Sequence, residues 1–402
     1  MKKSMRVLAV LLAVLVLLSG CETYDNFYNT FFAKEEEQPA VQNVKIGVFE
    51  PLTGGDSQAA ADELEGIELA HELYGTVLGR DVELVYADNE SDVQRAPQAA
   101  QELVDAGVSV ILGSCKSTLS LAASDVIEKA GIPAIGATCA NPIITEINRY
   151  YFRVCNIDSY EGEAAARFVY YGLSAPDAAV LCREGDDFNG AFAEAFAAKM
   201  KECTGDEFSV KIIEYPENTE DFSPYLFEVS TMNSGVVFFP GSQEDARLAV
   251  KQAIDNDYEF TWIGTSAWAG IETADEYVLE GGDYLLGVCY VAGIEVDAVE
   301  TATAAVFKKA YAEKHGEDKE PPLAAALGFD AYLLALEGIK KAGTAADTEA
   351  VTENLYGVYK LAGATGSISL NSDGDPLKDV VIDQIGYSGP ENIYVVSPKW
   401  DD

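Results

Sequence analysis

Residues 44–70 read VKIGVFEPLTGGDSQAAADELEGIELA, and they contain one expected strand followed by one expected helix. The first six residues are mostly apolar and end just before Pro51, which is typical of a short buried strand. From about Ala59 to Tyr74 the apolar residues recur with helical spacing. A short apolar strand that leads through a loop into an amphipathic helix is the repeating unit of a parallel α/β sheet.

The same alternation of strand and helix continues along the chain. Further strands are expected at Val82–Tyr86, Val108–Leu112, Ile132–Ile135, Ala178–Leu181, Val210–Ile213, Gly235–Phe239 and Phe260–Ile263. Helices are expected at Val93–Ala106, Thr118–Ala130, Asn189–Lys201, Gln243–Asn256, Ala298–His315 and Leu323–Ala342. The tail is expected to add strands at Gly366–Leu370 and Val380–Ile385. The predicted fold class is α/β, with two Rossmann-like lobes whose parallel sheets are covered on both faces.

The first twenty residues are expected to be a leader rather than part of the fold. Lys2, Lys3 and Arg6 precede an unbroken apolar run from Val7 to Leu18, which is too short to span a bilayer. The run ends in Leu18-Ser19-Gly20-Cys21, which resembles the bacterial lipoprotein signal, where the cysteine thiol receives a diacylglycerol. The resemblance implies an extracytoplasmic protein that is lipid-anchored to the bacterial cell membrane through Cys21. An ordinary signal peptide with an incidental cysteine is the alternative.

Residues 21–43 are expected to tether the folded part to that anchor. A polar stretch of three glutamates and a proline ends the segment. The aromatic residues before it, which recur with helical spacing, are Tyr24, Phe27, Tyr28, Phe31 and Phe32. Two interpretations stay open, a helix whose aromatic face lies in the membrane interface and a linker that merely contains aromatics.

Composition excludes several classes of partner. The 402 residues include 27 Lys+Arg and 67 Asp+Glu, so the formal net charge is −40. A phosphate backbone needs a basic face, so nucleic acid is not an expected partner, and docking on anionic lipid is disfavoured for the same reason. The length predicts two or three domains.

Motifs of catalysis and cofactor binding are missing. The sequence contains no GxGxxG, GxxxxGK[ST], CxxC or HExxH motif, and its two histidines, His71 and His315, provide little material for a metal site or a triad. Ser266 lies in Gly264-Thr265-Ser266-Ala267-Trp268, which misses the last glycine of a nucleophile elbow. We therefore expect no enzyme, no cofactor and no metal.

Six cysteines besides Cys21 are too widely spaced for a metal site, and they stand at positions 115, 139, 155, 182, 203 and 289. Buried free thiols are the first expectation. Cys115 and Cys139 would lie at neighbouring strand ends, so they are the pair to test for a disulfide.

The expected ligand site follows from the topology. In open parallel sheets ligands bind beyond the carboxyl ends of the strands. The loops at those ends are expected at residues 51–58, 114–118, 138–141, 184–188, 240–244 and 265–268. A cleft lined by these loops of both lobes is the expected binding site.

Several short pieces, taken in order, resemble the leucine/isoleucine/valine-binding protein family. Among them are Pro51-Leu52-Thr53-Gly54-Gly55, Glu65-Gly66, Ile111-Leu112-Gly113-Ser114, Asn141-Pro142, Asp187-Phe188-Asn189-Gly190, Phe239-Pro240-Gly241 and Ala325–Ala331. These proteins have the type I periplasmic-binding-protein fold and serve ABC importers. The resemblance implies one lobe at 44–157 plus 291–364 and a second at 158–290 plus 365–402. Three crossings would form a hinge, and closure would trap the ligand.

The resemblance also implies ligand contacts. Ser117 matches a serine that holds the ligand carboxylate, and with Thr118 it opens a helix whose free N–H groups favour an anion, although a plain helix cap is the alternative. The other contacts expected in the ligand loops are Thr138, Cys139, Ala140, Phe188, Gln243, Ser266 and Trp268. Phe188 matches an aromatic that covers the ligand, Ala140 lacks a hydroxyl that is usual there, and Trp268 is expected to form an apolar wall.

Ser266 departs from the family most clearly, because it falls where the family places the acid that pairs with the ligand ammonium. Loss of one partner of a buried ion pair costs roughly 3–5 kcal/mol, against about 8 kcal/mol in total for a micromolar binder. Either another acid replaces it or the ligand has no ammonium group. The candidate acids on the ligand loops are Glu184, Asp186, Asp187 and Glu244.

The predicted function is that of a lipid-anchored, monomeric solute-binding protein that delivers a small polar molecule to an ABC permease. A branched-chain-type amino acid is the first candidate ligand, and a small carboxylate or amide is the second. A surface receptor that signals on ligand closure is the rival class. A purely adhesive lipoprotein is a weaker rival, because it gives no reason for a cleft between two lobes.

Overall fold

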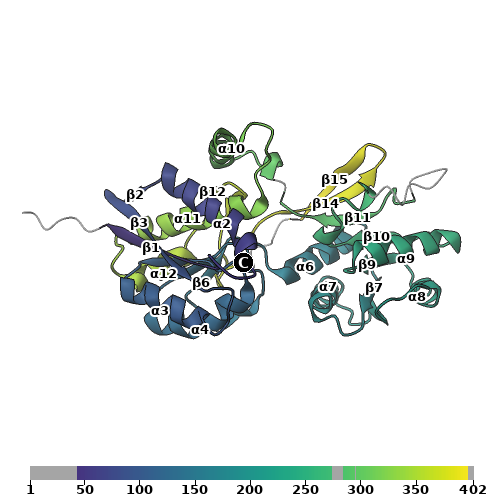
Figure 1. Cartoon of the computed structure of the whole chain (residues 1–402). Coiled ribbons are helices and arrows are strands. Elements are labelled where there is room, and N and C mark those ends of the chain that lie inside the picture. Colours follow the sequence, from purple (N-terminus) through teal and green to yellow (C-terminus); the bar gives the residue numbers. More distant parts are fainter. Residues whose placement is uncertain (1–42, 274–283, 295, 397–402) are drawn as a thin grey trace, which may run out of the picture. The chain divides into compact units, whose positions relative to one another are not determined.

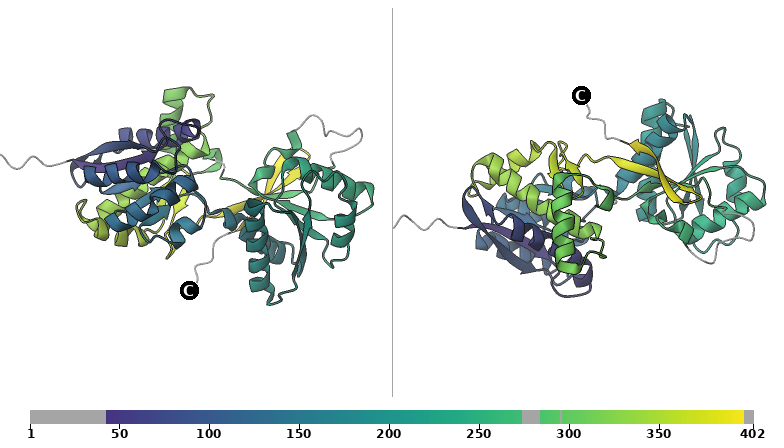
Figure 2. Two further views of the ribbon diagram at one scale, coloured as in Figure 1. Left: turned by 60° about the horizontal axis from the view of Figure 1, so that its bottom comes forward. Right: turned by 90° about the horizontal axis from the view of Figure 1, so that it is seen from above.

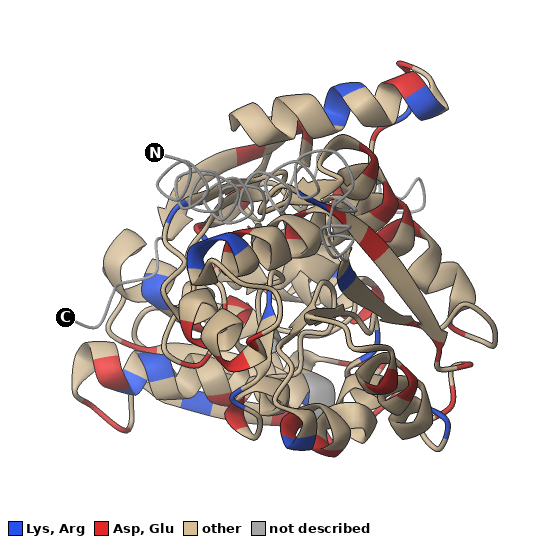
Figure 3. Ribbon diagram, turned by 90° about the vertical axis from the view of Figure 1, so that its left-hand side faces the viewer, with Lys and Arg blue, Asp and Glu red and all other residues tan. Residues whose placement is uncertain are grey.

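The computed structural model describes residues 43–273, 284–294 and 296–396 (Figure 1). The expected leader, Cys21 and the tether up to residue 42 lie outside the described residues. In the described part of the chain no helix is long and apolar enough to cross a membrane. Figure 3 shows aspartate and glutamate spread over the helices and loops, as expected where the whole sequence has 67 acidic and 27 basic residues.

The first sheet has its strands in the order β2-β3-β1-β4-β5-β6. Their bounds are β1 Val44–Glu50, β2 Thr76–Val77, β3 Arg80–Asp88, β4 Val110–Leu112, β5 Ala134–Gly136 and β6 Tyr151–Arg153. β1 lies in the middle and pairs in parallel with β3 and β4, while the short β2 pairs antiparallel with β3 at the edge. Parallel strands covered on both faces are mostly apolar and buried, which is the pattern of β1 and β4.

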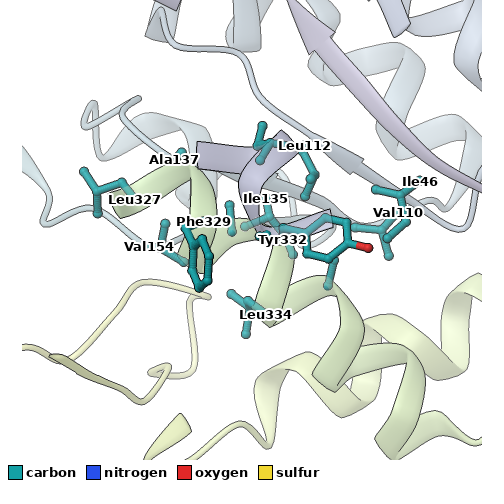
Figure 4. Close-up of a cluster of buried hydrophobic side chains, with 14 of the residues drawn as sticks. Ile46, Val110, Leu112, Ile135, Ala137, Val154, Leu327, Phe329, Tyr332 and Leu334 are labelled. Carbon is teal, nitrogen blue, oxygen red and sulfur yellow. The ribbon is translucent and has the colours of Figure 1, made fainter. Parts of the chain in front are cut away.

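Side chains of the first sheet alternate between two cores, one on each face. Ile46 and Val110 belong to the core shown in Figure 4, whereas Phe49 and Ile111 belong to the other. The helices that contribute to the first core are α2 Ser57–Leu73, α10 Ala302–His315, α11 Leu323–Ala342 and α12 Thr348–Tyr356. The helices that contribute to the second are α3 Ala96–Ala106, α4 Ser117–Ala130 and α5 Ile143–Glu146.

Helices α2 and α11 pack backbone against backbone. A Cβ atom added at Gly66 would overlap the carbonyl of Ala325, and one added at Gly328 would overlap the carbonyl of Glu63. Glycine at both positions therefore permits the close approach. This packing brings Glu63 of α2 under the carboxyl end of the sheet, where Glu50 ends β1.

The second sheet has the order β15-β14-β11-β10-β9-β7-β8. Its strands are β7 Ala178–Arg183, β8 Val210–Tyr215, β9 Val236–Phe239, β10 Thr261–Gly264, β11 Cys289–Ala292, β14 Val380–Gly386 and β15 Gly389–Val396. β14 pairs antiparallel with β11 and with β15, and the other neighbours are parallel.

Helices also cover both faces of the second sheet (Figure 2). One core includes Phe168 and Phe196, and the other includes Leu226 and Val250. The helices on these faces are α6 Asp158–Arg167, continuing into η1 Phe168–Gly172, α7 Asp187–Thr204, α8 Ser223–Val229 and α9 Gln243–Asp255. Short helical turns lie at η2 Ser266–Trp268, η3 Ile271–Thr273 and η5 Val296–Ala298. The expected α/β fold class with two parallel-stranded sheets is confirmed.

The chain passes from one sheet to the other three times: between β6 and α6, between β11 and α10, and between Leu370 and β14. The third crossing therefore begins later than the expected boundary at 365. β12 (Leu361–Gly363) and β13 (Gly366–Ile368) form a small antiparallel hairpin of their own. Ile368 and Leu370 are buried in the core around α11. The expected assignment of 366–370 to the second lobe is wrong, because these residues complete the first core before the chain crosses.

Candidate functional site

A hydrogen bond joins two of the loops at the carboxyl ends of the strands in the first sheet. In the first sheet, β4 leads through Gly113–Lys116 into α4, and β5 leads through residues 137–142 into α5. Ser117 begins α4, and its hydroxyl accepts a hydrogen bond from the backbone N–H of Asn141 at 3.3 Å. This bond joins the two loops, and Thr118 is exposed in the same first turn.

The loop after β5 uses its side chains differently from expectation. The Thr138 hydroxyl lies 2.7 Å from Glu63 Oε2, to which it donates, and 3.2 Å from the carbonyl of Cys115. Cys139 is buried in the core with its sulfur over Gly136, and burial raises the pKa of its thiol to about 12. Ala140 packs against the first core. The Cys139 side chain is therefore a core group, and a ligand can reach only the backbone at that position.

Arg153 holds the backbone of the loop after β5 by hydrogen bonds to its carbonyl groups. Its guanidinium, which is fully buried, donates to the carbonyls of Cys139 at 3.1 Å and Asn141 at 2.9 Å, and to the Thr145 hydroxyl at 2.7 Å. Arg153 Nε lies 2.6 Å from Asp375 Oδ1, on the third crossing. One buried ion pair therefore positions a predicted ligand loop and attaches the third crossing to it.

In the loop after β10 of the second sheet, Ser266 contacts a glutamate that was not among the candidate acids expected from the sequence. Its backbone N–H lies 2.8 Å from Glu161 Oε2, and its hydroxyl lies 2.7 Å from Glu161 Oε1. Glu161 is in the first turn of α6, 105 residues earlier in the chain. Both contacts orient the Glu161 carboxyl group toward the loop after β10. A carboxyl group thus lies beside Ser266 although position 266 itself has lost its acid.

Gln243 and Trp268 have internal partners. Gln243 Nε2 donates to the carbonyls of Ala267 and Ala269, each at 2.9 Å, and its Oε1 accepts from Arg247. Trp268 is 0 % exposed, and its indole N–H donates to the carbonyl of Gly241 at 3.0 Å. The Trp268 ring packs in the second lobe's core, so the expectation of an apolar wall facing a ligand is corrected. Gln243 acts as a clamp on the loop after β10.

The other acids on the ligand loops have different placements. Glu184 and Glu244 are exposed. Asp186 caps α7 by accepting from the N–H of Asn189 at 3.1 Å, and it pairs with Arg183 at 2.6 Å. Phe188 and Asp187 lie in the first turn of α7, and their side chains are outside the described residues. Of the predicted acids whose side chains are described, none contacts Ser266 as Glu161 does.

Cysteine and metal chemistry add nothing to this site. The cysteines at positions 115, 139, 155, 182, 203 and 289 are all free. Within the described ranges no group of three or more His, Cys, Asp or Glu side chains could hold a metal ion.

Comparisons with known proteins agree with the α/β fold described above. The model of the periplasmic binding protein family matches residues 43–389. A Leu/Ile/Val-binding protein of Rhizobium johnstonii is 26 % identical over 345 residues, covering 83 % of this chain and 89 % of its own.

Solved structures show the same resemblance. A leucine-binding protein from Thermotoga maritima is 30 % identical, with a TM-score of 0.63 over 88 % of this chain and 99 % of its own. A solute-binding protein of R. palustris in complex with benzoate has the same fold at 20 % identity, with a TM-score of 0.62, covering 90 % of this chain and 98 % of its own. The chain belongs to the periplasmic binding protein family, and it is a solute-binding protein of the ABC-transporter type rather than an enzyme.

Proposed function

We propose that this protein captures a branched-chain-type amino acid outside the cytoplasmic membrane and delivers it to an ABC permease. Ser117 and the N-terminus of α4 would hold the ligand carboxylate, with Thr118 beside them. Glu161 would pair with the ligand ammonium, in place of the acid missing at Ser266. The lipoprotein-like run Leu18-Ser19-Gly20-Cys21 supports attachment to the membrane by a lipid on Cys21. The names of the relatives support the choice of ligand.

The Glu161 carboxylate beside Ser266 is the observation that carries this proposal. An ammonium buried without a negative partner would be too costly for useful affinity. The sequence left that partner undefined, and the fold supplies an acid at the carboxyl end of β10. The family resemblance supports Phe188 as a cover of the ligand, and the backbone of Thr138–Ala140 would provide further contacts.

A thermal-shift experiment tests the ligand class. Leucine, isoleucine or valine at 100 times its dissociation constant should add about 2.7 kcal/mol to the free energy of unfolding. For a folded part of this size that corresponds to a rise in Tm of roughly 3–4 °C. The measurement is differential scanning fluorimetry of the purified protein with the twenty amino acids and with small carboxylic acids and amides. A shift with an unaminated acid alone would contradict the amino-acid proposal.

Replacing Glu161 with glutamine tests the ammonium partner. The change keeps the shape and the acceptor for Ser266 but removes the charge, so we expect amino-acid affinity to fall by about 2 kcal/mol or more, roughly 30-fold. Calorimetric titration at pH 7 measures it. The matched control is Glu163→Gln, because Glu163 lies on the same helix and pairs with Lys199 at 3.4 Å instead. Equal affinity of the two variants would remove Glu161 from the site.

Two alternatives remain distinguishable. A small carboxylate or amide is the second candidate ligand, and the benzoate complex of the R. palustris protein supports it, because the anion site at α4 suits any carboxylate. In that case Glu161→Gln should bind the acid as tightly as, or more tightly than, the unchanged protein. A sensing role would use the same cleft with a receptor in place of the permease.

A further inference from the structure

Two glutamates meet in the interior of the first lobe. Glu50 is the last residue of β1, and Glu63 lies in the second turn of α2. Both side chains are 0 % exposed, and their carboxyl groups are within hydrogen-bonding contact of each other. Each has one oxygen, Oε1, that is buried and accepts from no donor. Two acceptors in contact, with an unpartnered oxygen on each, require a proton between them.

The second oxygens of the pair bind the two ligand loops of this lobe. The backbone N–H of Cys115 lies 2.9 Å from Glu50 Oε2, and the Thr138 hydroxyl lies 2.7 Å from Glu63 Oε2. Cys115 stands two residues before Ser117, and Thr138 lies in the loop that Asn141 joins to Ser117. The carboxyl pair is therefore the link beneath both loops.

No positive charge in the described part of the chain neutralises the pair. Neither glutamate forms an ion pair with any described lysine, arginine or histidine. The charged or titratable groups that face the pair or its neighbours from the ends of β4, β5 and β6 are Cys115, Lys116, Cys139, Tyr151 and Arg153. Lys116 lies 3.5 Å from Asp56, and Arg153 lies 2.6 Å from Asp375. The residues of α11 packed against α2 here, Ala325 and Gly328, carry no charge.

The electrostatic environment also favours a protonated pair. Burial, followed by repulsion from Glu63, raises the pKa of Glu50 well above the ordinary glutamate value, and burial raises the pKa of Glu63 as well. Burial also raises the pKa values of the Cys115 thiol and the Tyr151 hydroxyl, so these neighbours stay uncharged. Two ionised carboxylates in contact at a buried site would repel each other strongly.

We propose that Glu50 and Glu63 share one proton in the folded protein, and that this proton holds the loop after β4 to the loop after β5. Because the pair binds a proton that the unfolded chain has lost, its stabilisation is complete below the unfolded glutamate pKa of about 4.3 and decreases as pH rises through the folded pair's titration. Each pH unit in that window lowers the folding equilibrium constant roughly ten-fold. Solute affinity falls in the same direction, a consequence that rests on the proposed function.

The test compares Glu50→Gln with the unchanged protein. Glutamine can donate an N–H to Glu63, so the pair no longer needs a proton. We expect unfolding at pH 7 to release about one proton fewer from Glu50→Gln, and the Tm of this variant to decline less between pH 5 and pH 9. Infrared difference spectra should show a protonated carboxyl band in the unchanged protein at pH 7 that is absent from the variant. Glu63→Gln should behave alike and provides the test if Glu50→Gln does not fold.

Glu83→Gln is the matched control, because Glu83 is exposed on β3 and its replacement makes the same change in formal net charge. A pH dependence of Glu50→Gln and Glu63→Gln equal to that of Glu83→Gln, or no protonated carboxyl band at pH 7, would overturn the shared proton. These two readouts need no solute, so they stand even if no amino acid binds. With a solute in hand, a dissociation constant that rises with pH in the unchanged protein but not in Glu50→Gln supports the link to the loops, and equal profiles refute it.

Discussion

Replacing Arg153 with methionine is expected to lower the free energy of unfolding by about 3–5 kcal/mol, because it leaves the carboxylate of Asp375 buried without its cation. The guanidinium is fully buried and also binds the carbonyls of Cys139 and Asn141. Methionine keeps most of the volume but none of the donors. Urea unfolding at pH 7 measures the stability, and solute titration should show weaker binding because the loop after β5 loses its support.

Arg149→Met is the matched control, because it removes the same group from the surface. Arg149 is 48 % exposed and pairs with Glu349 at 2.9 Å and with Glu353. Exposed ion pairs contribute about 1 kcal/mol or less. A loss for Arg153→Met no larger than that of Arg149→Met would mean that the buried pair does not hold the crossing.

The alternating elements could be predicted from the sequence because burial on both faces leaves a clear pattern. β4 and β9 are unbroken apolar runs and β1 and β7 are mostly apolar, and each was expected within a few residues of its observed bounds. β6 was missed, because it has only three residues and ends in an arginine whose burial depends on a partner far along the chain. Periodicity carries no information about such a partner.

Short strands and the antiparallel part of the second sheet were harder to predict. β15 covers Gly389–Val396, and most of its residues are exposed or half-buried, so its apolar pattern is weak. β11 was missed because a four-residue apolar run can belong to a strand or to a loop. Strand β13 was assigned to the wrong lobe, since only the packing of Ile368 in the core around α11 decides that question.

At the candidate site, the positions of the loops could be predicted from the topology, whereas the directions of the side chains could not. The ligand loops follow from strand order, and the structure brings Ser117 together with the loop of Thr138 as expected. Whether a loop residue points outward or inward depends on local backbone turns, which explains why Trp268 was expected at a ligand and is instead buried. Glu161 and the Glu50–Glu63 pair depend on contacts between distant segments, for which the only local signal was an acid at the start of a helix or the end of a strand.

Replacing Asp330 with alanine is expected to cost a further large part of the stability, again about 3–5 kcal/mol. Asp330 lies in α11 and is fully buried, where it accepts from the N–H and the hydroxyl of Thr365. That hydroxyl in turn accepts from Lys378 Nζ, so ammonium, hydroxyl and carboxylate form one buried chain. Without Asp330 the Lys378 ammonium keeps only the Thr365 hydroxyl as a hydrogen-bond partner among the described residues, and burial already lowers the pKa of Lys378.

Because Lys378 lies on the third crossing, the hydrogen-bonded chain of Asp330, Thr365 and Lys378 has a structural role beyond the first core. The backbone carbonyl of Lys378 accepts from the Tyr160 hydroxyl of α6, so the same residue is bound to elements of both sheets. If the charge pair is responsible, Asp330→Leu combined with Lys378→Met should lose less than the sum of the two single changes, because neither charge is then left unpaired. Urea unfolding of all four proteins measures this coupling.

Asp255→Ala is the surface control. It breaks the exposed Lys251–Asp255 pair and should cost about 1 kcal/mol or less. Strict additivity of the two buried changes would contradict the pairing and would leave Thr365 as the group that holds the crossing.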